Sequence, residues 1–114
     1  MAFDTTEFTT VDVVTKTATS TAAAATVNAQ TGVVTTEALS TAAAATYSFT
    51  LTNSYIKAGS IVLVTVGKGT ATTGEPAVHF VTPAAGSAVI AIRNDAAAAA
   101  LNGTITIGFA VFNI

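Results

Sequence analysis

Large apolar side chains occupy every second position in two segments of this chain. Tyr47, Phe49 and Leu51 alternate with Ser and Thr across residues 46–52. A period of two places one set of side chains on a single face of a β-strand, so this segment predicts a strand with one buried face. Residues 104–112 repeat the pattern. The predicted inward positions there are Ile105, Ile107, Phe109 and Val111.

Three further segments also predict strands. Residues 61–66 are mostly β-branched and apolar on both faces, which is typical of a strand at the centre of a sheet. Residues 78–81 form a short strand that we expect to end before Pro83, because proline cannot donate to a sheet ladder. Residues 87–93 alternate again, and Val89 is expected on the face opposite its isoleucine neighbours.

Glycine and polar residues between these segments predict turns. Residues 27–34 are typical of a β-hairpin in which Gly32 is free to adopt a positive φ angle. Residues 67–76 are interrupted by glycine and predict a long loop. Asp95 is a favourable N-cap residue, so we expect one helical turn across residues 96–101.

The heptapeptide Ser-Thr-Ala-Ala-Ala-Ala-Thr occurs twice, at residues 20–26 and 40–46. Two copies in a chain rich in Ala and Thr are weak evidence for a duplicated unit. Four alanines favour helix, but so short a run cannot offset the cost of helix nucleation. We therefore predict that both copies are transitions from a loop into a strand.

Together these patterns predict about seven or eight short strands separated by regular turn signals. Such an arrangement is typical of an all-β protein with an antiparallel β-sandwich or jelly-roll-like architecture. The strand alternation and the abundance of Thr and Val exclude a helical bundle. Because a chain of 114 residues has the usual size of one domain, we assign residues 17–114 to a single β-sandwich domain.

The first residues of the chain, 1–16, are its most charged stretch and leave two interpretations open. They hold either a first strand near Thr10–Thr17 after a frayed end, or an N-terminal arm that docks on a neighbouring subunit. Chain termini become ordered only when they are tied down, and exposed phenylalanines favour burial against a partner. The candidate partner contacts are Phe3, Phe8, Val11 and Val13.

The composition narrows the possible partners. Only 9% of the residues are charged, the net charge is −2, and four cations are too few to neutralise a run of phosphates, so nucleic acid is excluded. The longest apolar run, Ala96–Leu101, is far shorter than the roughly 18 residues of a membrane span. The N-terminus lacks the pattern of a secretory signal, which predicts a soluble cytoplasmic product. Low charge favours association, so we expect copies of this chain or a partner to cover part of its surface.

Few residues could perform chemistry. His79 is the one histidine, and catalysis would require a nucleophile or an orienting carboxylate beside it, so a strand-surface or interface role is expected. The Gly67-Lys68-Gly69 sequence lacks the spacing of a phosphate-binding loop. The carboxylates lie in separate segments, Arg93 and Asp95 are expected to form a local ion pair, and cysteine is absent. We therefore predict no catalytic residue, no cofactor and no metal ligand.

Four segments in the C-terminal part of the chain combine turn and strand signatures: Leu51–Ser54, Gly59–Val64, Thr82–Ser87 and Ala100–Thr104. Through these segments, residues 46–112 resemble a group of small β-sandwich proteins on the virion surface of tailed bacteriophages, including cyanophages. Residues 1–45 lie outside the match.

The resemblance implies a structural role without an active site. Proteins of this group serve as capsid decoration (cement) proteins, head fibres or tail-fibre tips. It implies a homotrimer on the capsid surface that binds the major capsid protein after assembly in the host cytoplasm. Two alternatives are a fibre module that binds a host receptor or glycan through residues 67–75 and 94–103, and a small depolymerase. The missing fibre shaft and the scarcity of aromatic residues disfavour the first, and the lack of an acid/base pair disfavours the second.

Overall fold

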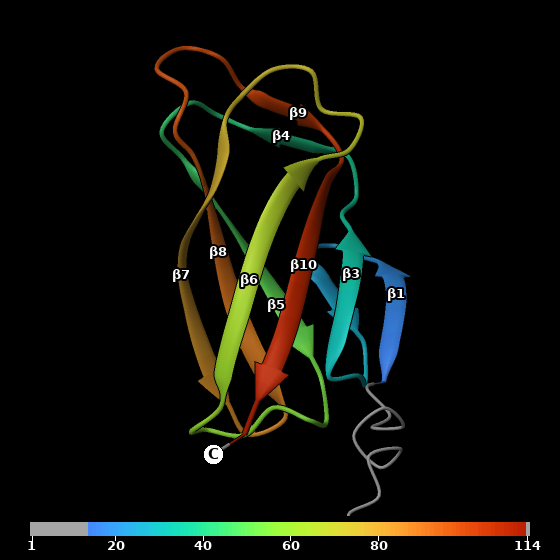
Figure 1. Ribbon diagram of the computed structural model, residues 1–114. Helices are drawn as coiled ribbons and strands as arrows, with labels where there is room; N and C mark the ends of the chain where they lie inside the picture. The colour runs from blue at the N-terminus through green and yellow to red at the C-terminus, as the bar shows by residue number, and fades with distance from the viewer. Residues whose placement is uncertain (1–13, 114) are drawn as a thin grey trace, which may run out of the picture.

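The computed structural model describes residues 14–113 and contains ten β-strands within that range, and no helix (Figure 1). The all-β prediction is therefore confirmed for the described residues. More strands are present than the seven or eight expected, because three of them are only three residues long. The strands are β1 (Thr15–Thr19), β2 (Ala24–Thr26), β3 (Thr31–Thr35), β4 (Leu39–Thr41), β5 (Thr46–Thr52), β6 (Ile61–Lys68), β7 (Pro76–Ala84), β8 (Ser87–Asn94), β9 (Leu101–Gly103) and β10 (Ile105–Phe112).

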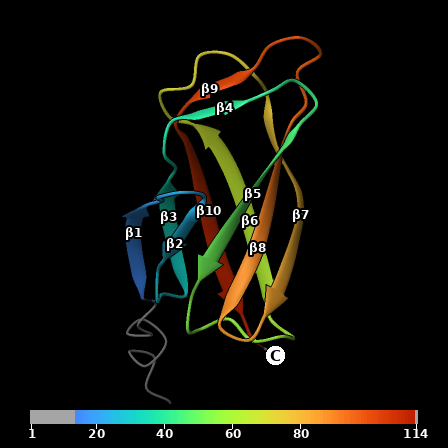
Figure 2. The same cartoon turned by 180° about the vertical axis from the view of Figure 1, so that it is seen from behind.

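The strands form two four-stranded sheets and one two-stranded sheet. The first sheet has the order β1-β3-β10-β6 and the second the order β2-β5-β8-β7. Opposite views show the two sheets as front and back layers, with β4 and β9 across one end (Figures 1 and 2). Most neighbours are antiparallel, but β1 pairs with β3 and β2 with β5 in parallel. In both parallel pairs an N-terminal strand, β1 or β2, forms the edge of its sheet, and the two pairs lie at the same side of the molecule (Figures 1 and 2).

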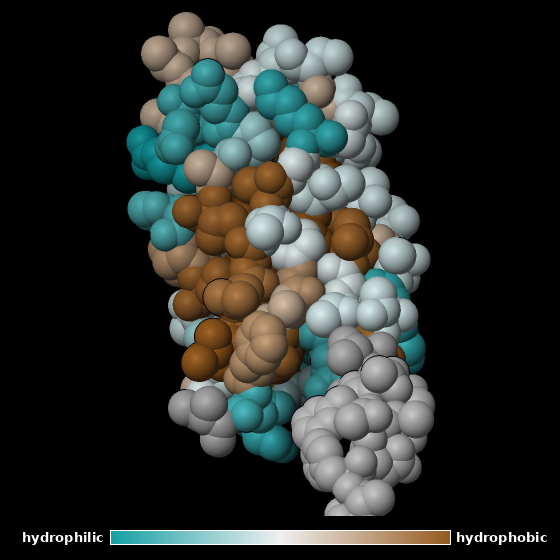
Figure 3. Space-filling view, viewed as in Figure 1, coloured by the Kyte–Doolittle hydropathy of each residue, from teal (hydrophilic) through white to brown (hydrophobic). Residues whose placement is uncertain are grey.

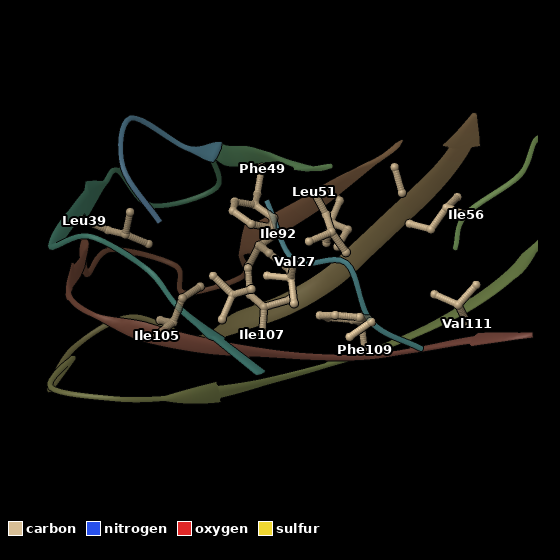
Figure 4. Packing of buried hydrophobic residues seen from close by; sticks show 14 of the residues in the cluster. Val27, Leu39, Phe49, Leu51, Ile56, Ile92, Ile105, Ile107, Phe109 and Val111 are labelled. Atoms are coloured by element: carbon tan, nitrogen blue, oxygen red, sulfur yellow. The ribbon is translucent and has the colours of Figure 1, made fainter. Parts of the chain in front are cut away.

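One hydrophobic core fills the space between the two sheets (Figure 4). Phe49 and Leu51 of β5 have no exposed surface, as the alternation of residues 46–52 predicts. The four predicted inward residues of β10 are also buried, which confirms that prediction. Val89 is 37% exposed while its isoleucine neighbours are buried, also as expected. The largest buried apolar side chains are Phe49, Leu51, Ile56, Ile90, Ile92, Leu101, Ile105, Ile107 and Phe109.

The predicted hairpin at residues 27–34 is wrong. β2 ends just before this segment and β3 begins within it, and the two strands belong to different sheets and do not pair. Gly32 lies inside β3 without a positive φ angle. A Cβ atom on Gly32 would lie 2.5 Å from the Lys16 carbonyl oxygen and 2.8 Å from the Phe109 ring. Glycine is therefore needed there because the backbone and an aromatic ring approach closely, and no turn is involved.

The predicted central position of residues 61–66 is also wrong, because β6 is an edge strand of its sheet. One face of β6 packs on the core through Val62, Val64 and Val66. The opposite face is apolar but exposed, with Ile61 at 47% and Leu63 at 56% exposure. Two apolar faces on a strand therefore do not require that other described residues cover both of them.

The expected helical turn at residues 96–101 does not form. Asn94, rather than Asp95, organises this segment: its Oδ1 accepts hydrogen bonds from the backbone N–H groups of Glu75 (3.0 Å) and Ala96 (3.1 Å). Its Nδ2 donates to the carbonyl oxygens of Thr41, Ala42 and Ala99. A buried amide thus satisfies backbone groups from three loops that would otherwise lack partners.

Both heptapeptides lead into strands, as predicted: residues 20–26 end in β2, and residues 40–46 end at the first residue of β5. Their backbones nevertheless differ. Positive φ angles occur at Ala22 and Ala23 in the first copy but at Ala44 in the second. Identical sequence therefore adopts different turns according to what each copy contacts.

Candidate functional site

The outer face of the β1-β3-β10-β6 sheet is the main candidate site. Strand register places residues of all four strands in rows across this face, and none of these outward positions carries a charged side chain. Three of the rows are Thr19–Thr35–Thr106–Gly67, Thr17–Val33–Gly108–Thr65 and Thr15–Thr31–Ala110–Leu63, and a shorter one pairs Phe112 with Ile61.

Large apolar side chains stand exposed on this face. Ile61, Leu63, Val33 and Phe112 are 47%, 56%, 42% and 51% exposed. The space-filling view shows the hydrophobic surface gathered along β6, with hydrophilic residues towards both ends of the molecule (Figure 3). Contact with a partner would remove this apolar area from water, which is the main source of free energy for protein association.

An open groove of about 480 Å³ lies on the same face. Gly108 leaves its floor without a side chain, and Val33 and Leu63 rise on either side of it. This volume lies within the range of roughly 300–1,000 Å³ that is typical of ligand pockets. The groove therefore has room for an aromatic or aliphatic side chain. Its lining consists of Thr15, Thr31, Gly32, Val33, Leu63, Thr65, Gly108, Phe109 and Ala110.

The second sheet carries a smaller apolar area at its own edge strand. A β-bulge between Val78 and Phe80 interrupts the register of β7 with β8. The bulge prevents His79 from alternating regularly with Val78 and Phe80, and all three residues are exposed. The rings of His79 and Phe80 lie 5.1 Å apart. The expected strand-surface position of His79 is confirmed.

Glu37 is the centre of a polar cluster that joins the two heptapeptide regions. Ser20 Oγ donates to Glu37 Oε1, the Ala23 N–H donates to Oε2 at 2.9 Å, and Tyr47 Oη lies 3.1 Å from both oxygens. Burial raises the pKa of Glu37, but these hydrogen bonds outweigh it and leave the pKa below its ordinary value. Burial, together with the neighbouring Glu37 charge, raises the pKa of Tyr47 to about 12.

This cluster stabilises the fold around the first heptapeptide. Both carboxylate oxygens of Glu37 already accept hydrogen bonds from Ser20, Ala23 or Tyr47. A general base needs a free lone pair directed at a substrate, and the polar donors here occupy those directions instead. Sequence analysis did not identify the cluster, because Glu37 and Tyr47 meet only through tertiary packing.

The other predicted residues are dispersed. Phe3, Phe8, Val11 and Val13 lie outside the described residues, so their role as partner contacts remains a prediction. Arg93 Nε lies 3.1 Å from Asp95 Oδ1, which confirms the local ion pair. Within residues 14–113, no group of three or more His, Asp or Glu side chains gathers as metal ligands would. The described part of the chain offers no helix that could serve as a membrane span.

Comparisons of the chain with protein-family models, with curated proteins and with solved structures give no match.

Proposed function

We propose that this protein is a non-enzymatic structural component of a bacteriophage virion, a capsid decoration protein that binds the major capsid protein lattice and stabilises the head. The observation that carries the proposal is the uncharged outer face of the β1-β3-β10-β6 sheet, with four large apolar side chains exposed on it. A face of this kind is suited to binding by contact area and shape.

Strand connectivity supports a jelly-roll-like sandwich for this protein. In the order β3, β5, β6, β7, β8, β10, successive strands change sheet at every step except the β7–β8 hairpin. The first and last strands of this series, β3 and β10, are neighbours in one sheet. Alternation between two sheets with adjacent first and last strands is characteristic of Greek-key and jelly-roll folds.

The charge arrangement also supports a binding role rather than catalysis. Glu37 is hydrogen-bonded on both oxygens, and Arg93 is paired with Asp95. His79 lies on an exposed strand beside Phe80. None of these described groups lines the groove. The surface most able to receive another molecule therefore has no ionisable side chain in its lining.

Self-association into a homotrimer is part of the proposal. A stable interface buries about 800 Å² of surface on each partner. A single row of side chains across the sheet has less surface than this. The uncharged face extends over four strands, so it could contribute to contacts between copies as well as to contacts with the capsid. The predicted N-terminal arm would add to either contact.

The test is binding of the full chain to phage heads that lack a decoration protein, measured by co-sedimentation. Ile61→Asp places a charge on the exposed face and is expected to weaken binding by tenfold or more. Val89→Asp, on the outer face of the other sheet, is the matched control and should bind like the unaltered protein. Absence of binding by the unaltered protein, or equal binding by Ile61→Asp, would contradict the proposal.

A second candidate is a head-fibre or tail-fibre tip that binds a host receptor or glycan. One observation favours it: the two loops expected to contact a host meet at the end of the molecule that β4 and β9 cover. The N–H groups of Thr72 and Thr73 both donate to Asn102 Oδ1 at 3.0 Å, and Thr73 Oγ1 donates to the Ala100 carbonyl. Binding to a glycan array, abolished by Thr73→Ala, would favour this candidate over the first.

A further inference from the structure

The described chain begins at the edge of the groove. Thr15, the first residue of β1, is one of the groove-lining residues, and residues 1–13 precede it in sequence. We propose that residues 1–13 of one copy occupy this groove on a second copy. The inference rests on the proposed function, in which the N-terminal arm is a contact segment, and identifies the surface that receives the arm.

The groove is suited to apolar side chains. It is walled by Val33 and Leu63, with Gly108 and Ala110 between them. The lining residues with polar side chains are all threonines, and their methyl groups also suit an apolar occupant. The volume of about 480 Å³ is enough for at least one aromatic ring and its neighbours.

The N-terminal segment supplies matching side chains. Phe3 and Phe8 each offer about 150–250 Å² of surface for burial. Val11 and Val13 continue the apolar character towards the start of β1. A groove with only glycine and alanine between its walls leaves room for the large apolar groups of this segment.

The charges of the two parts do not oppose docking. Residues 1–13 contain three acids, Asp4, Glu7 and Asp12, and no Lys or Arg, which gives a side-chain charge of −3. The described remainder has four bases and three acids, a charge of +1. The groove itself has no charged lining residue to repel the segment. The four bases are Lys16, Lys57, Lys68 and Arg93, and the three acids are Glu37, Glu75 and Asp95.

The geometry favours a second copy over the same copy. Backbone N–H groups of Gln30 and Thr31 both donate to the Val14 carbonyl at 3.1 Å, so the chain is already fixed beside β3 where it enters β1. To enter its own groove the chain would have to turn sharply just before Val14. Residues 9–14 are Thr-Thr-Val-Asp-Val-Val, mostly β-branched and without Gly or Pro, and Asp12 is the one common turn residue among them. Thirteen extended residues span at most about 45 Å, enough to cross onto a neighbour.

The experiment uses the full chain with a single fluorescent reporter. The protein contains no tryptophan, so Phe8→Trp introduces the only one. We expect its emission to shift to shorter wavelength, with protection from iodide quenching, at high protein concentration. Dilution should reverse both effects, because the docking partner is another copy.

Two further variants test the groove. Adding Leu63→Asp should abolish the emission shift, because Leu63 is a groove wall and is 56% exposed, so the fold tolerates the change. Val89→Asp, on the other sheet, should leave the shift intact. Circular dichroism of each variant verifies that it is folded.

Each contrary outcome overturns the inference in a distinct way. A shift that persists unchanged on dilution assigns the segment to its own groove. No shift at any concentration, or equal loss in both charge variants, means that the groove does not receive the segment. Because no phage particle is present, these results are independent of head binding, and failure of head binding alone would leave them standing.

Discussion

Glu37 and Tyr47 show how one hydrogen-bonded pair can link two loops of identical sequence. Ser20 and Ala23 of the first heptapeptide bind Glu37, while Tyr47 directly follows the second. The carboxylate is held in its charged form and the phenol in its neutral form, so the pair is most stable between the two pKa values. The opposite pKa shifts therefore have consequences at opposite ends of the pH scale.

Tyr47→Phe should change the alkaline limit of stability. The folded pKa of Tyr47 is raised from 10.0 to about 12, so its contribution is complete below pH 10 and is lost as the pH rises towards 12. The variant should be less stable at pH 7 by about 1–2 kcal/mol, because it loses a charge-assisted hydrogen bond. Urea denaturation from pH 7 to 12 should show this deficit shrinking above pH 10; a constant deficit would contradict the assignment.

At the level of elements, β3 and β10 fit together because Gly32 lies opposite Phe109. The Phe109 ring packs where a Gly32 side chain would project, and the Lys16 carbonyl lies on the same side. This contact sets how closely β1, β3 and β10 approach. Sequence patterns indicated a turn at Gly32, because glycine is common in turns, and did not reveal the ring that covers it.

Gly32→Ala should destabilise the protein by about 1–3 kcal/mol, because the added Cβ meets a backbone carbonyl oxygen that cannot move alone. Gly59→Ala is the matched control, since a Cβ there has nothing within 4 Å. That control should be neutral or slightly stabilising, as it reduces the freedom of the unfolded chain. Thermal denaturation of both variants measures the difference, and equal melting temperatures would contradict the packing argument.

At the level of the whole molecule, one core joins the two large sheets. Phe49 and Leu51 from β5 and Ile107 and Phe109 from β10 fill the same space (Figure 4). Neither sheet has a second buried face among the described residues, since the outer faces are exposed. The two sheets should therefore unfold together.

Phe49→Ala should remove about 3–5 kcal/mol of stability, because Phe49 has no exposed surface and truncation leaves a cavity. The two sheets should still lose structure in a single transition. Far-ultraviolet circular dichroism and tyrosine fluorescence, followed in the same denaturation, should give coincident midpoints. Separate midpoints would show that the sheets are stabilised independently.

The sequence by itself determined the all-β class and the faces of the long strands. Alternation in residues 46–52 and 104–112 identified the inward residues correctly, because the period of a strand is local and the core selects one face. It also indicated that a large part of the surface is poor in charge. These properties depend on neighbours along the chain, so they can be read without knowing the fold.

Only the tertiary structure decided which strands are neighbours and where the apolar surface is left open. Residues 61–66 look like a central strand, yet β6 lies at an edge and exposes Leu63. Asn94 and Glu37 acquire their partners from loops distant in sequence. Pairing and coverage depend on contacts between distant segments, and no local pattern of side chains specifies these.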